Sequence, residues 1–142
     1  MGKFFSASPA GLSGGIALVR IITGVLLLYH GRECFNAEKM EMYTGWFSDR
    51  HYTQPALWAY TGKLAELLSG AGLVLGLFTR LAALGVIAAF TGIIFLLGDK
   101  GKIFEGDQHP FLFILLSLVF LFTGPGFPSF DSRIFKNKGN RN

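Results

Sequence analysis

The sequence predicts an all-α integral membrane protein: a four-helix bundle with a short interfacial helix in its first outer connection. Its 142 residues are 51% hydrophobic and 15% charged, with a mean hydropathy of +0.44. Four apolar segments lie near residues 11–30, 57–78, 81–98 and 110–127. Each approaches the roughly 20 residues that a helix needs to cross a hydrocarbon core about 30 Å thick. We therefore expect one transmembrane domain over residues 1–142, because these helices leave little chain for a second.

The first two segments begin in ways that suit membrane helices. Arg20 interrupts the apolar run of segment 11–30, whereas a secretory signal carries its charge before an uninterrupted core and ends at a cleavage site. We therefore expect a retained helix. Segment 57–78 follows Pro55, and proline is well tolerated in the first turn of a helix.

The connection between these segments, residues 31–56, is longer than the two to eight residues or so that usually join helices in bundles. Phe35, Met42, Tyr43, Trp46 and Phe47 recur in it at near-helical spacing, with charged residues between them. This pattern predicts a short amphipathic helix at the membrane interface, anchored by Trp46. An irregular lid is the alternative.

The remaining segments are separated by glycines. The short stretch 76–80 leaves almost no loop, so segments 57–78 and 81–98 should form an antiparallel hairpin. Gly72 and Gly76 are spaced as small residues that let helices approach closely, and we interpret them as packing rather than dimerisation residues. Gly124-Pro125-Gly126 ends segment 110–127, because proline lacks the N–H donor that continues a helix.

An even number of crossings places both termini on one side of the membrane. The bare count of basic residues on the two sides hardly decides the orientation, but the short second loop and the basic tail favour cytoplasmic termini. The counts are six on the terminal side and five on the outer side: Lys3, Arg80, Arg133, Lys136, Lys138 and Arg141, against Arg32, Lys39, Arg50, Lys100 and Lys102.

Composition and motifs exclude several functions. The net charge of +4 lies largely in the tail, where it suits a cytoplasmic flank, so we expect no nucleic-acid binding. One cysteine, Cys34, allows neither an internal disulfide nor a CxxC redox pair. The sequence contains no nucleotide loop or nucleophile motif. Its three histidines follow no metal-ligand spacing, so we expect interfacial histidines and no metal site.

Arg20, Lys63 and Glu66 are charged residues within the apolar segments. Each costs roughly 2.5–3.5 kcal/mol on insertion, so such groups normally face the bundle interior and pair. At 1.5 Å per residue, Arg20 should lie about 12 Å and Glu66 about 18 Å from the inner boundary. An arginine side chain could bridge that difference, and Lys63 shares a helix face with Glu66. The sequence therefore predicts one buried network.

Two interpretations of this network remain open. In the first, the charges form a ligand site for a quinone-like or other polar head group, with Glu66 as proton acceptor, Arg20 holding it ionised, and Lys63 and His30 nearby. In the second, Arg20 and Glu66 are an ion pair that only locks the helices, and Lys63 extends outward. The sequence identifies no catalytic residue, and whether the protein is an enzyme stays open.

The sequence also resembles the DoxX family over nearly its whole length. The resemblance lies in Leu18-Val19-Arg20, in Tyr29-His30-Gly31, and in the runs 66–70, 76–84 and 124–131. The sequence departs from the family pattern at Cys34, where a lysine often follows the His-Gly pair, and at Pro128 and Phe130 in the final motif.

This resemblance implies a multi-pass protein of the bacterial inner membrane. It also implies a redox-linked or quinone-associated subunit that works with a membrane or periplasmic redox partner, in some members in oxidative-stress defence. Arg20 and Glu66 are the site residues that the resemblance carries over. The alternatives are a non-catalytic carrier of lipid or small molecules and an accessory scaffold. Substrate, partner and assembly, including a homo-oligomer, remain undetermined.

Overall fold

The computed structural model describes residues 9–98 and 102–136, and within these ranges the chain is helical without β-strands. The predicted all-α class is confirmed, including a helix in the first long connection. The elements are α1 (Pro9–Gly31), the 3-10 turn η1 (Arg32–Phe35), α2 (Ala37–Asp49), α3 (Pro55–Leu75), α4 (Thr79–Gly92), the π-helical turn η2 (Ile93–Leu97), α5 (Gln108–Thr123) and α6 (Phe130–Lys136).

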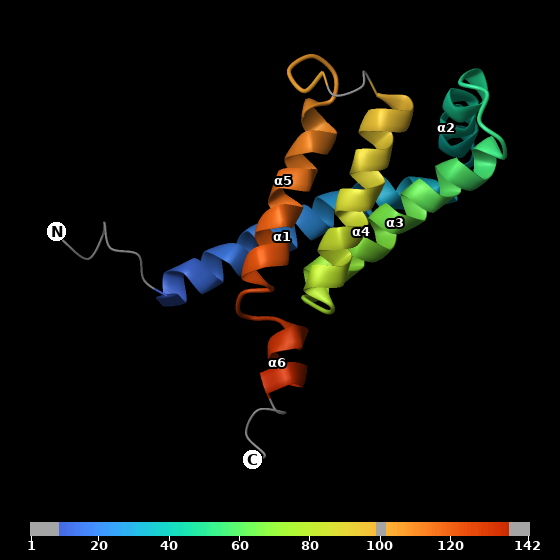
Figure 1. Ribbon diagram of the computed structural model, residues 1–142. Coiled ribbons are helices and arrows are strands. Elements are labelled where there is room, and N and C mark those ends of the chain that lie inside the picture. The colour runs from blue at the N-terminus through green and yellow to red at the C-terminus, as the bar shows by residue number, and fades with distance from the viewer. Residues whose placement is uncertain (1–8, 99–101, 137–142) are drawn as a thin grey trace.

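Two antiparallel helix pairs form the bundle (Figure 1). α1 packs along α3, and α4 packs along α5. α2 lies against α3 at one end of the bundle, near the α4–α5 connection, and we call this the α2 end. The α3–α4 turn and α6 lie at the opposite end, the α6 end. The N-terminal part of α1 extends away from the other helices.

Each of the four long helices begins two residues before its predicted apolar segment. The first turn is polar or contains proline, so it adds nothing to an apolar pattern. α5 ends at Thr123, earlier than residue 127, because Gly124 and Gly126 adopt positive φ values of 79° and 66°. Such angles end a helix and are adopted at little cost by glycine.

Close backbone contact holds α1 to α3. A Cβ atom added at Gly24 would lie 2.7 Å from the backbone nitrogen of Val74, and one at Gly70 would lie 2.9 Å from the carbonyl oxygen of Gly24. Only glycine permits this approach. Gly72 faces Ala82, whose Cβ would lie 3.0 Å from an added Cβ, so it packs within the α3–α4 hairpin.

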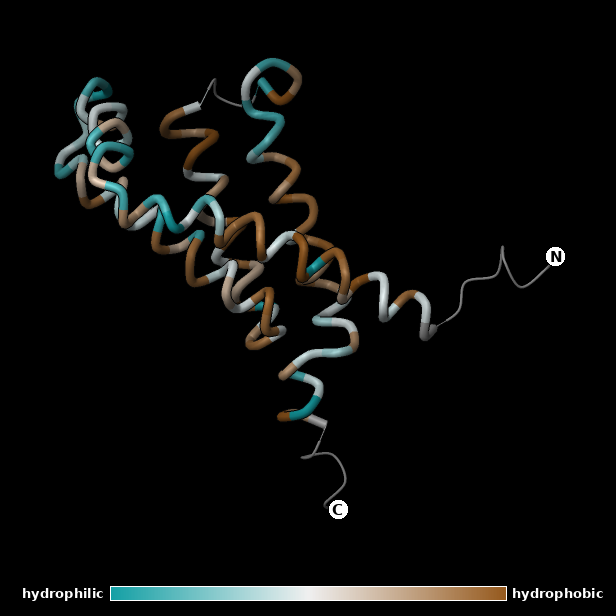
Figure 2. Tube along the Cα trace, turned by 180° about the vertical axis from the view of Figure 1, so that it is seen from behind, coloured by the Kyte–Doolittle hydropathy of each residue, from teal (hydrophilic) through white to brown (hydrophobic). Residues whose placement is uncertain are grey.

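The apolar surface of the bundle faces outward as well as inward. Buried side chains form a core in which the rings of Phe90 and Phe113 stack at 5.0 Å. Many large apolar side chains are nevertheless exposed, among them Leu68 and Leu81. Figure 2 shows the bundle helices as largely hydrophobic, with hydrophilic residues concentrated at α2, in the α4–α5 connection and on α6. An exposed apolar surface of this extent suits contact with lipid.

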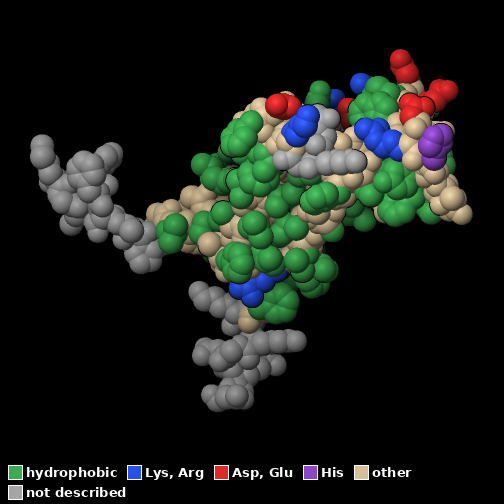
Figure 3. Space-filling model, turned by 45° about the horizontal axis from the view of Figure 1, so that its top comes forward, with side chains coloured by type: hydrophobic (Ala, Val, Ile, Leu, Met, Phe, Trp, Pro, Cys, Tyr) green, Lys and Arg blue, Asp and Glu red, His purple; other side chains and the backbone are tan. Residues whose placement is uncertain are grey.

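Among the described residues, two helical stretches are long and apolar enough to cross a membrane: Gly11–Phe35 and Thr79–Leu97. The stretch Gln108–Thr123 is apolar but shorter. Figure 3 shows acidic, basic and histidine side chains gathered at the α2 end, while hydrophobic side chains cover the sides of the helices. Four crossings, and the orientation of the termini, stay predictions.

Candidate ligand-binding site

Arg20 is 1% exposed and donates hydrogen bonds to backbone carbonyls. Its Nε bonds the oxygen of Pro125 at 2.8 Å and its Nη2 bonds that of Pro128 at 2.8 Å, both in the loop after α5. Its Nη1 bonds the carbonyls of Leu73 and Val74 in the last turn of α3. The Leu73 carbonyl also accepts the N–H of Gly76 at 3.2 Å, and both carbonyls lie at the negative end of the helix dipole. Arg20 therefore ties α1, α3 and the α5–α6 loop together.

The predicted pair between Arg20 and Glu66 is wrong. Glu66 bonds Lys63 instead, and it lies seven residues before Leu73, roughly 10 Å along α3 from the Arg20 site. The depth count failed because Leu12 does not mark the inner boundary of the bundle. It is 64% exposed, whereas Gly24 packs against Gly70 and Val74 of α3, so the start of α1 extends beyond the end of α3 and away from the other helices (Figure 1). Arg20 consequently lies at the α6 end.

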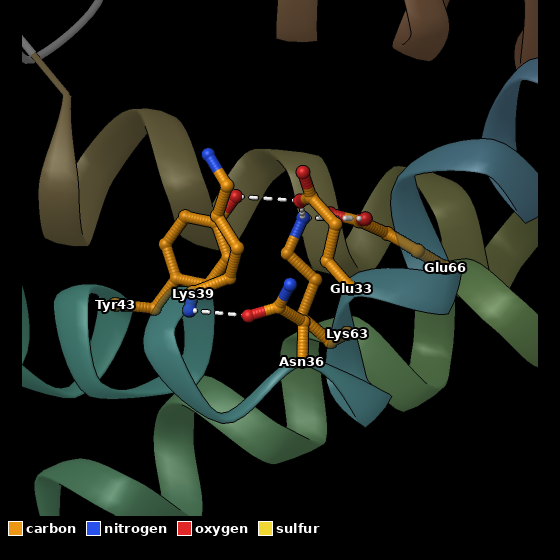
Figure 4. A network of polar contacts seen from close by, with 6 residues as sticks. All are labelled: Glu33, Asn36, Lys39, Tyr43, Lys63 and Glu66. Atoms are coloured by element: carbon orange, nitrogen blue, oxygen red, sulfur yellow. Dashed lines mark hydrogen bonds and ion pairs between the residues drawn. The ribbon is translucent and has the colours of Figure 1, made fainter.

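Glu66 belongs to a cluster at the α2 end (Figure 4). The Lys63 Nζ lies 3.0 Å from Glu66 Oε2 and 3.1 Å from Glu33 Oε2. The Tyr43 hydroxyl donates to Glu33 Oε2 at 2.5 Å. The Glu66 side chain is 4% exposed, so its charge depends on Lys63 for compensation. We call Glu33, Tyr43, Lys63 and Glu66 the carboxylate cluster; it unites η1, α2 and α3.

The sequence prediction missed Glu33 and Tyr43 as members of this cluster. Asn36 is the residue that could have indicated this arrangement from the sequence, because asparagine is a favoured N-cap. Its side chain accepts a hydrogen bond from the backbone N–H of Lys39 and so caps α2. That cap starts a new helix just after α1 and brings Tyr43 back over Glu33. Burial, together with the hydrogen bond donated to Glu33, raises the pKa of Tyr43, so its hydroxyl stays protonated at neutral pH.

A cavity of about 230 Å³ adjoins the carboxylate cluster. It lies between α2, α3, the α4–η2 segment and the start of α5. Drug-sized ligands usually occupy about 300–1,000 Å³, so this cavity suits a group the size of a single ring. Much of its lining is aromatic: Tyr43, Trp46, Phe47, Trp58 and Phe90. Its polar or titratable lining residues are His30, Lys63, Glu66 and His109.

Two of the three histidines meet at this cavity. The rings of His30 and His109 contact each other edge to face, with centroids 5.3 Å apart. His51 is exposed in the turn after α2 and does not line the cavity. In the described ranges, no group of three or more histidine, cysteine, aspartate or glutamate side chains is placed to hold a metal ion. Cys34 is free and buried near Met40.

The cavity therefore collects Glu66, Lys63 and His30, whereas Arg20 lies at the opposite end of the bundle. The DoxX family model matches residues 15–99, which include the whole carboxylate cluster. The chain belongs to the DoxX family.

Two relatives align with this DoxX protein over most of their length. A protein of Bacillus subtilis (strain 168) named "Putative oxidoreductase CatD" is 32% identical over 130 residues, covering 90% of this chain and 92% of its own. A protein of Haemophilus influenzae (strain ATCC 51907 / DSM 11121 / KW20 / Rd), described as uncharacterized, is 30% identical over 127 residues, covering 85% and 91%. No solved structure matches the chain significantly.

Membership of the DoxX family and the apolar helices identify a membrane protein, for which a lipid bilayer is the surrounding medium. Placement in a bacterial inner membrane and cytoplasmic termini stay predictions. The family match ends before His109 and before the loop that binds Arg20.

Proposed function

We propose that this DoxX protein is a redox-linked membrane subunit whose cavity at the α2 end binds the ring of a quinone-type molecule. The observation that carries the proposal is the combination, in one cavity of about 230 Å³, of aromatic walls with a buried lysine–glutamate pair. A flat ring can stack on the aromatic side chains, and its oxygens need polar partners on one side. The name of the Bacillus relative gives further support.

The carboxylate cluster supplies partners for both oxidation states of such a ligand. A quinone oxygen accepts hydrogen bonds, and the Lys63 ammonium group is a donor. A quinol hydroxyl donates, and the Glu66 carboxylate is an acceptor that can take its proton. Reduction of a quinone consumes two electrons and two protons, and in this proposal a redox partner protein exchanges the electrons. Arg20 takes no part, because its hydrogen bonds go to backbone carbonyls.

A carrier that binds the same ring without electron transfer is the second candidate. The cavity supports it directly, because stacking walls and one polar side select a ring whether or not electrons pass. The two candidates differ in one measurable respect: a redox subunit changes the oxidation state of the ring in the presence of its partner, and a carrier does not.

Intrinsic fluorescence offers a specific binding assay. The chain contains two tryptophans, and both Trp46 and Trp58 line the cavity. A short-chain quinone bound there should quench their emission saturably. Glu66→Gln should weaken quinol binding about tenfold, since a charged acceptor is about twice as strong as a neutral one. Glu105→Gln is the matched control, because Glu105 forms the same i,i+3 pair with Lys102 on the exposed surface.

Failure to quench saturably would refute binding at this cavity. Equal effects of the two glutamate variants would show that the carboxylate cluster does not contact the ligand. Membranes that contain the partner then separate the candidates. If the protein is a redox subunit, quinone reduction should be slower in the Glu66→Gln strain. Unchanged reduction in that strain, together with saturable quenching of the wild-type protein, would favour the carrier.

A further inference from the structure

A second cavity, of about 280 Å³, lies at the α6 end. It is separate from the proposed quinone site and includes the buried Arg20. Its polar lining residues are Arg20, Ser129 and Arg133, which we call the polar side. Its apolar lining residues include Val74, Leu75 and Phe130, which we call the apolar side.

The polar side carries an excess of positive charge. All the hydrogen bonds of Arg20 go to neutral carbonyls. Asp131 is the carboxylate that acts on Arg20 electrostatically, but its two oxygens accept the backbone N–H groups of Phe78 and Thr79 at 2.7 and 2.8 Å. Arg133 is exposed and makes no hydrogen bond or ion pair with other described residues. Two guanidinium groups therefore line this cavity, and the carboxylate that acts on Arg20 is already engaged with backbone N–H groups.

The apolar side faces the surroundings of the bundle. Leu75 and Phe130 are both about half exposed, at 48% and 47%. On α6, Ile134 and Phe135 are exposed as well, next to Arg133. Exposed apolar side chains alternating with a basic residue are typical of a segment at the boundary between lipid and water. The cavity thus combines a site for an anion with a surface for hydrocarbon chains.

We propose that this cavity binds the phosphate-bearing head group of an anionic membrane lipid. Arg133 would bind the phosphate from the rim, because its guanidinium fork matches phosphate oxygens. Arg20 uses four of its five N–H donors on carbonyls, so it would contribute its positive charge and its remaining donor from the inner wall. Acyl chains would follow Leu75 and Phe130. A free phosphate ion would leave this apolar side without a contact, so the lipid is the better match. The inference is independent of the quinone proposal.

Lipid retention in the full-length protein tests this site. Protein in detergent micelles supplemented with phosphatidylglycerol or phosphatidylcholine is analysed by native mass spectrometry and by thermal unfolding. Phosphatidylglycerol should be retained in preference and should raise the melting temperature more. Arg133→Gln should weaken its binding about fivefold, the effect of removing one basic residue near an anionic surface. Arg133 makes no hydrogen bond or ion pair with the described residues, so this variant should melt like the wild type in phosphatidylcholine.

Arg80→Gln is the matched control, because Arg80 is exposed near the same end at the start of α4 but does not line this cavity. It should retain phosphatidylglycerol as the wild type does. Equal retention of the two lipids by the wild type, or equal losses in the two arginine variants, would overturn the proposal. Stabilisation by millimolar inorganic phosphate equal to that by phosphatidylglycerol would overturn the lipid as the ligand.

Discussion

Replacement of Arg20 by leucine should destabilise the bundle by about 3 kcal/mol. The variant removes the guanidinium donor from the carbonyls of Leu73, Val74, Pro125 and Pro128. A buried acceptor without a partner costs about 1–3 kcal/mol. The Leu73 carbonyl keeps the N–H of Gly76 at 3.2 Å, and the carbonyl of the exposed Pro128 can find water. The carbonyls of Val74 and Pro125, both half-buried residues, lose their donor. Two substantial losses therefore set the magnitude.

A double-mutant cycle tests where the charged groups meet. Unfolding is followed by circular dichroism as a denaturing detergent replaces a mild one in mixed micelles. Arg20→Leu and Glu66→Leu should act additively within about 0.5 kcal/mol, because the two sites do not contact each other. Lys63→Leu and Glu66→Leu should instead couple by at least 1 kcal/mol or so, because each single variant leaves a partner charge uncompensated.

Two results would refute this reasoning. Coupling of more than about 1 kcal/mol between Arg20 and Glu66 would show that they interact, as the depth count from the sequence predicted. A loss of less than about 1 kcal/mol for Arg20→Leu would show that water or lipid replaces the guanidinium group at the carbonyls.

Three further predictions concern packing, capping and orientation. Gly24→Ala should cost about 1–3 kcal/mol, because its Cβ would overlap the α3 backbone; unfolding in mixed micelles measures it. Asp131→Ala should cost about 1–2 kcal/mol by the same assay, because it removes the acceptor for two N–H groups at the start of α4. In a Cys34→Ala background, an impermeant thiol reagent applied to intact cells should label a cysteine at the exposed Phe104 but not one at Phe135.

Each of these predictions has a control or a contrary outcome. Gly15 lies on α1 as Gly24 does, but an added Cβ there has nothing within 4 Å, so Gly15→Ala should not destabilise the bundle and should gain up to about 1 kcal/mol from the higher helix propensity of alanine. Equal losses at the two glycines would show that contact with α3 does not decide the cost. An Asp131→Ala variant as stable as the wild type would place the stabilisation of the α4 start elsewhere. Labelling at Phe135 in intact cells would reverse the orientation.

The sequence by itself determined the helices and most of their ends. Apolar runs specified α1, α3, α4 and α5, since a helix that meets lipid must be apolar over most of its surface. The spacing of Trp46 and Phe47 with charged residues specified α2. The glycines at 76, 124 and 126 marked ends, because each adopts a positive φ that suits glycine.

The tertiary structure alone decided which charged groups meet. Counting residues gives the depth of a side chain only if each helix enters the membrane where its apolar run begins, and the overhanging start of α1 breaks that assumption (Figure 1). Arg20 bonds backbone carbonyls, which every residue carries, so no side chain in the sequence could identify them as its partners. Glu33 and Tyr43 join Lys63 only because the Asn36 cap turns α2 back over η1. These contacts depend on the direction that the chain takes after a turn. The spacing of apolar residues in the sequence contains no information about that direction.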